Sequence, residues 1–64
     1  MNEIGKLLIL IPHWIEHNQE HAEEYRQWAT YAGQASEDIL KASDALELVN
    51  SALNSALQKL KSLE

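Results

Sequence analysis

All three histidines of this 64-residue chain lie in one short segment, at His13, His17 and His21. On an α-helix, a spacing of four residues stacks side chains one turn apart on nearly the same face. Imidazole binds divalent transition ions, and two imidazoles with carboxylate or water suit nickel, cobalt or zinc. The outer two histidines are separated by about 12 Å along a helix axis. The spacing therefore predicts that an adjacent pair, rather than all three, binds one ion, and His17 and His21 are the preferred ligands.

Carboxylates accompany the histidines along the same segment. Glu20 and Glu24 follow His17 and His21 by three residues, where each could complete a coordination sphere or orient an imidazole. If the chain folds back on itself, Glu47 lies at the height of His21 on the second arm. The sequence thus predicts a divalent metal site, for nickel, cobalt or zinc, with candidate ligands His13, His17, His21, Glu20, Glu24 and Glu47.

A second interpretation stays open for the same residues. His21 lies in the middle of an apolar arc that contains Trp14, Tyr25 and Trp28. A histidine in such a place often packs inside a bundle and hydrogen-bonds to a carboxylate, and a row of glutamates is often a solvated helix face. The chain is then a module for protein interaction or oligomerisation, without metal.

An enzymatic function is not expected. Residues 13–17 and 17–21 both match H-x-x-E-H, the pattern of inverted zinc peptidases. That chemistry needs a third ligand from a distant element and a substrate cleft, and a two-helix arm has little room for a cleft. The overlap of the two matches indicates that the four-residue histidine spacing alone produces them.

The second half of the chain carries a strong helical pattern. From Ser36 onward, apolar residues alternate spacings of three and four, which predicts a helix over residues 36–63. Ser36 is a candidate N-cap because acidic residues follow it. The predicted seam comprises Ile39, Ala42, Leu46, Val49, Leu53, Ala56, Leu60 and Leu63. Further apolar residues widen this stripe, which indicates that more than one neighbour covers the helix.

The first half predicts helices over about residues 3–11 and 12–32, which form one arm kinked at Pro12. Gly33 is a natural helix terminator. The short link to residue 36 makes the two arms antiparallel neighbours. The sequence therefore predicts an all-α fold, an antiparallel helical hairpin that forms one domain over residues 1–64.

Size and composition predict a partner chain. A domain this small buries only about 60% of its unfolded surface, and the chain has no cysteine for a disulfide. A metal or oligomerisation would supply the missing stability. Two hairpins packed as a four-helix bundle would cover the wide apolar stripe, so we expect a homo-oligomer, first of all a dimer. A different protein could take the place of the second copy.

Charge excludes other partners. The net charge is −5 and the five basic residues are scattered, so no basic face exists for nucleic acid or for an anionic membrane surface. No apolar stretch approaches the roughly 20 residues that span a bilayer. A signal-peptide pattern is also absent, which predicts a cytoplasmic location.

The segment that contains the histidines resembles a known grouping. The run Pro12-His13-Trp14-Ile15-Glu16-His17-Asn18, continued by His21-Ala22-Glu23-Glu24-Tyr25, is similar to a family of short uncharacterised prokaryotic proteins and appended domains, a domain of unknown function with a P-H-W-x-E-H-N-x-x-H-A-E-E core. The resemblance covers about residues 7–32, and the second helix resembles it only as a generic Ala/Leu/Glu helix. It implies a helical hairpin and implies no activity.

Overall fold

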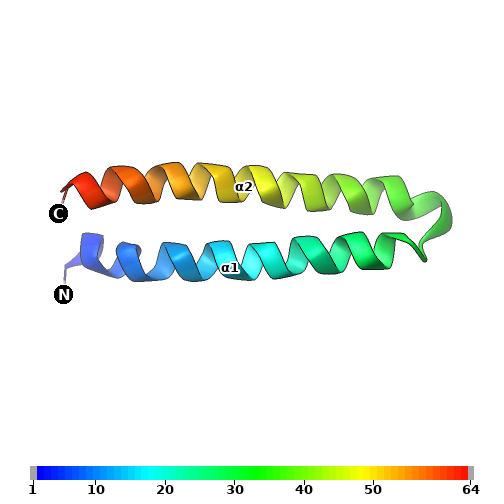
Figure 1. Cartoon of the computed structure of the whole chain (residues 1–64), viewed down its shortest axis with the longest axis horizontal. Coiled ribbons are helices and arrows are strands. Elements are labelled where there is room, and N and C mark those ends of the chain that lie inside the picture. Colours follow the sequence, from blue (N-terminus) through cyan, green and yellow to red (C-terminus); the bar gives the residue numbers. More distant parts are fainter. Residues whose placement is uncertain (1, 64) are drawn as a thin grey trace.

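The computed structural model describes residues 2–63, which form two long helices joined by a tight turn (Figure 1). α1 spans Glu3–Ala29, the 3-10 turn η1 spans Gly33–Ala35, and α2 spans Ser36–Leu63. The helices run antiparallel and side by side, and both chain ends lie at the same end of the molecule (Figure 1). The dimensions are 47 × 16 × 12 Å, so the molecule is one helix thick. The predicted all-α helical hairpin is confirmed.

The first arm is one continuous helix. α1 passes through Pro12 without interruption, so the predicted division into helices over 3–11 and 12–32 is wrong. Proline lacks the amide that would bond to the carbonyl of Leu8, which weakens the helix locally. The neighbouring side chains offset this loss, because Ile11 is buried and Ile15 half-buried toward α2. Tertiary packing therefore decides the continuity of α1.

The turn between the helices begins earlier than expected. α1 ends at Ala29, and the amides of residues 30–32 donate to carbonyls three residues back, which tightens the chain. Gly33 has a φ of +58°, a left-handed conformation that glycine adopts without steric cost, and it terminates this segment as predicted. Ser36 has helical torsions (φ −55°, ψ −46°) and is the first residue of α2 rather than its N-cap.

The seam between the helices matches only half of the predicted one. The regularly spaced buried and half-buried positions of α2 are Ile39, Ser43, Leu46, Asn50, Leu53, Leu57 and Leu60. Val49 and Leu63 were predicted there but are 44% and 68% exposed. Two neighbouring rows of residues on α2 repeat at helical spacing, one with Val49 and one with Ser43 and Asn50. The prediction chose the row with Val49 because that row is more hydrophobic. The helix is rotated so that Ser43 and Asn50 face α1 instead.

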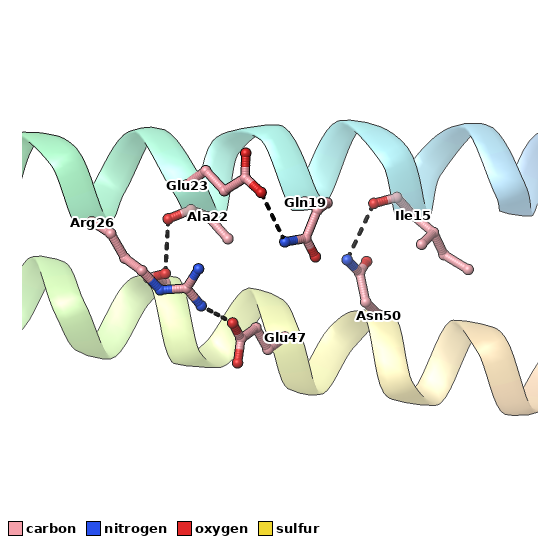
Figure 2. Close-up of polar contacts among 8 residues, drawn as sticks. Ile15, Gln19, Ala22, Glu23, Arg26, Glu47 and Asn50 are labelled. Carbon is pink, nitrogen blue, oxygen red and sulfur yellow. Dashed lines mark hydrogen bonds and ion pairs between the residues drawn. The ribbon is translucent and has the colours of Figure 1, made fainter.

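Polar groups of α2 hydrogen-bond to α1 across the seam. Ser43 Oγ donates to the carbonyl of Ala22 at 2.8 Å, and both residues are fully buried. Asn50 Nδ2 donates to the carbonyl of Ile15 at 3.1 Å (Figure 2), and Asn18 Nδ2 donates to Asn50 Oδ1 at 3.0 Å. A polar residue within a helical seam selects one register, because other registers leave it without a partner.

We expect Ser43→Leu to destabilise the hairpin by about 1–3 kcal/mol, because the fully buried site against Ala22 has no space for a larger side chain. Ser43→Ala removes only a hydroxyl, so its cost should stay within about 1 kcal/mol. Urea unfolding followed by circular dichroism, at one protein concentration, measures both. Equal stabilities of the two variants would show that the helices do not approach closely at this site.

Replacing the asparagine pair tests the register. Asn50→Leu alone should be less stable than the double variant Asn18→Leu/Asn50→Leu by about 1–3 kcal/mol, because it leaves the half-buried Asn18 amide without its partner. Compared with wild type, the double variant should be more stable, but its two helices should pair in more than one register. Urea midpoints give the first comparison, and amide hydrogen exchange gives the second. If the amides of the double variant are protected from exchange as uniformly as those of wild type, the asparagine pair does not select the register.

Candidate functional site

One flank of the seam is polar. On each helix, the residue that follows every second seam position lies beside the seam. In an antiparallel pair, these residues of the two helices meet on the same side. Arg26 of α1 and Glu47 of α2 form an ion pair there (Figure 2). Both side chains are more than a third exposed, so the pair contributes at most about 1 kcal/mol. We call this side the polar flank, and it comprises Gln19, Arg26, Glu47, Asn54 and Lys61, with Pro12 and Leu40 as its apolar members.

The opposite flank is apolar along the full length of the hairpin. Residues that directly precede alternate seam positions recur every seven residues on each helix and face this side. We call it the apolar flank, and it comprises Leu7, Trp14, His21, Trp28, Ala42, Val49, Ala56 and Leu63. Trp14 and Trp28 are 41% and 66% exposed. Thus α1 contributes mostly large side chains to the flank, and α2 contributes two alanines together with Val49 and Leu63.

Little apolar surface is buried inside the hairpin itself. Among residues 2–63 the buried apolar side chains are Ile11, Ala22, Ala29 and Leu57. The accessible surface is 4887 Å², whereas a compact monomer of 7.3 kDa exposes about 4,200 Å². The excess is about 700 Å². The hairpin therefore exposes more surface than a compact monomer of its mass, as expected for an elongated single layer of two helices.

The three histidines lie on exposed parts of α1 in two separate arrangements. The rings of His13 and His17 have centroids 4.8 Å apart and an interplanar angle of 78°. His21 is tied to other neighbours: its Nδ1 lies 3.0 Å from Glu24 Oε1, and its ring stacks on Tyr25 with centroids 6.3 Å apart. The predicted pairing of His21 with Glu24 is thus present, whereas His17 pairs with His13.

One chain does not gather the predicted ligands around one ion. Within residues 2–63, no three or more His, Cys, Asp or Glu side chains are placed to hold a metal. Glu47 was predicted to face His21, but it lies on the polar flank and pairs with Arg26. Glu20 adds no third ligand to either histidine arrangement. The rotation of α2 about its axis explains this, because it directs Glu47 to the flank opposite His21.

The turn end of the molecule carries an open hollow. Its lining residues are Gln27, Trp28, Thr30 and Tyr31. The rings of Trp28 and Tyr31 are 5.8 Å apart and tilted by 57°. Its polar groups are the side chains of Gln27, Thr30 and Tyr31.

Comparison with known proteins yields one match. A family model described as a domain of unknown function (DUF8180) matches residues 7–60. This match reaches beyond the 7–32 segment that carries the resemblance in the sequence and includes most of α2. Neither the curated proteins nor the solved structures contain a match to the chain. In the described part of the chain, neither helix combines the length and the apolar character that crossing a membrane requires.

Proposed function

The chain belongs to the family of the domain of unknown function DUF8180, and from its geometry we propose that it is a self-associating, non-enzymatic helical module. Two hairpins pack their apolar flanks together and form a four-helix bundle. The observation that carries this proposal is the continuous apolar flank on a molecule only one helix thick. No third element within residues 2–63 covers this flank.

The composition of the apolar flank favours a second copy of the same chain. A two-fold axis brings the same patch of both subunits together. Each flank carries large side chains on α1, such as Trp14, and two alanines on α2, Ala42 and Ala56. Large residues of one copy can therefore pack on small residues of the other, which is how well-packed helix interfaces interdigitate.

Two further functions rest on narrower observations. A different protein with an amphipathic helix could occupy the apolar flank instead of a second copy. Binding of a divalent transition ion is favoured by the contact between the His13 and His17 rings. A metal site does not account for the exposed tryptophans, and a second copy needs no other protein, so self-association comes first.

Two adjacent substitutions on α2 test the proposal. Val49→Glu places a carboxylate in the apolar flank, whereas Leu48→Glu places it on the outer face, where Leu48 is 73% exposed. We expect wild type and Leu48→Glu to sediment at twice the 7.3 kDa chain mass. Val49→Glu should weaken association by at least about tenfold, because an unpaired buried charge is costly. Analytical ultracentrifugation across a concentration series measures this difference.

Two results would overturn self-association. One is a wild-type protein that stays monomeric at every concentration. The other is equal weakening by Val49→Glu and Leu48→Glu, which would place the contact elsewhere or make it unspecific. A folded wild-type monomer whose mass rises only with an added amphipathic helical peptide would favour the heterologous partner.

A further inference from the structure

The separation of the His13 and His17 rings can be compared with that of two imidazoles bound to one ion. An ion bound to imidazole lies about 2.0–2.1 Å from the nitrogen, and so about 3.2 Å from the centre of the ring. Two rings that bind one ion at angles between octahedral and tetrahedral values then have centroids about 4.5–5.2 Å apart. The observed separation is 4.8 Å. The spacing of these two rings therefore already corresponds to that of a two-imidazole site.

His17 has a second possible partner one turn away, but that partner is engaged. His21 gives its Nδ1 to Glu24 and stacks on Tyr25. The contact with Glu24 uses only Nδ1 and leaves His21 Nε2 free for an ion. The ring of His21, however, lies against Tyr25, whereas the ring of His17 lies against His13. The His13 and His17 rings already contact each other and would lose no other such contact. Of the two pairs, the His13/His17 pair is thus better prepared for an ion.

His13 is directed away from both the seam and the apolar flank. The seam residues Ile11 and Ile15 are two positions before and after it, so on a helix His13 lies on the opposite side from α2. Both His13 and His17 are exposed. An ion can therefore reach this pair whether the hairpin is monomeric or associated, and water can fill its remaining coordination positions.

We propose that His13 and His17 form a surface chelate for one divalent first-row transition ion. Imidazole nitrogens select copper, nickel, zinc and cobalt over magnesium and calcium, which require oxygen ligands. Affinity should follow the usual order, with copper tightest and cobalt weaker than nickel. This inference is independent of self-association, because the pair belongs to one helix of one chain.

The test is a nickel titration of the tag-free full chain by isothermal calorimetry, with two matched variants. Each variant, His13→Ala and His21→Ala, removes one exposed histidine and introduces a good helix former, so both should stay folded. We expect one ion per chain in wild type. His13→Ala should weaken binding by at least about tenfold, and His21→Ala should change it by less than about threefold. Circular dichroism without metal checks the fold of each variant.

A thermal melt provides a second readout. An ion that binds only the folded helix raises its melting temperature, so saturating nickel should stabilise wild type and His21→Ala but not His13→Ala. The absence of saturable binding would overturn the proposal. So would binding that survives in His13→Ala and is lost in His21→Ala, which would place the site at His17 and His21. Unchanged nickel affinity in Val49→Glu is expected and separates this site from the interface.

Discussion

The hydroxyl of Ser43 reaches the carbonyl of Ala22 at 2.8 Å, between two residues that are both fully buried. Helices approach this closely only where the facing side chains are small, and the hydrogen bond forms in only one register. Asn50 adds a second contact of the same kind, with the carbonyl of Ile15. Together these contacts set both the register of the hairpin and the rotation of α2 about its own axis.

This rotation divides the surface of the hairpin into two unlike flanks. With Ser43 turned inward, Glu47 falls beside Arg26, while Val49 falls on the side that carries Trp14. A single layer of two helices has no further element to cover the second side, so the apolar surface stays exposed to solvent unless another chain covers it. Small helical domains commonly complete their core in this way. For this reason we propose self-association as the function.

The three histidines lie at different angles around α1 and therefore on different surfaces of the hairpin. Each step of four residues rotates a side chain by about 40°, so the row turns gradually around the helix. His21 consequently belongs to the apolar flank, whereas His13 lies on the outer face. His17 lies between them and contacts the ring of His13. The proposed ion site and the proposed interface therefore use different faces of the same helix, and each can be removed without the other.

Local physics, readable from the residues alone, accounts for the two long helices, the turn at Gly33 and the placement of all three histidines on α1. Helical periodicity and the torsional freedom of glycine are properties of short segments. Two features depend instead on packing between the helices: α1 continues through Pro12, and Ser43 rather than Val49 faces the other helix. A hydrophobic pattern cannot choose between two neighbouring rows on one helix, because that choice depends on how closely the backbones approach and which polar groups meet.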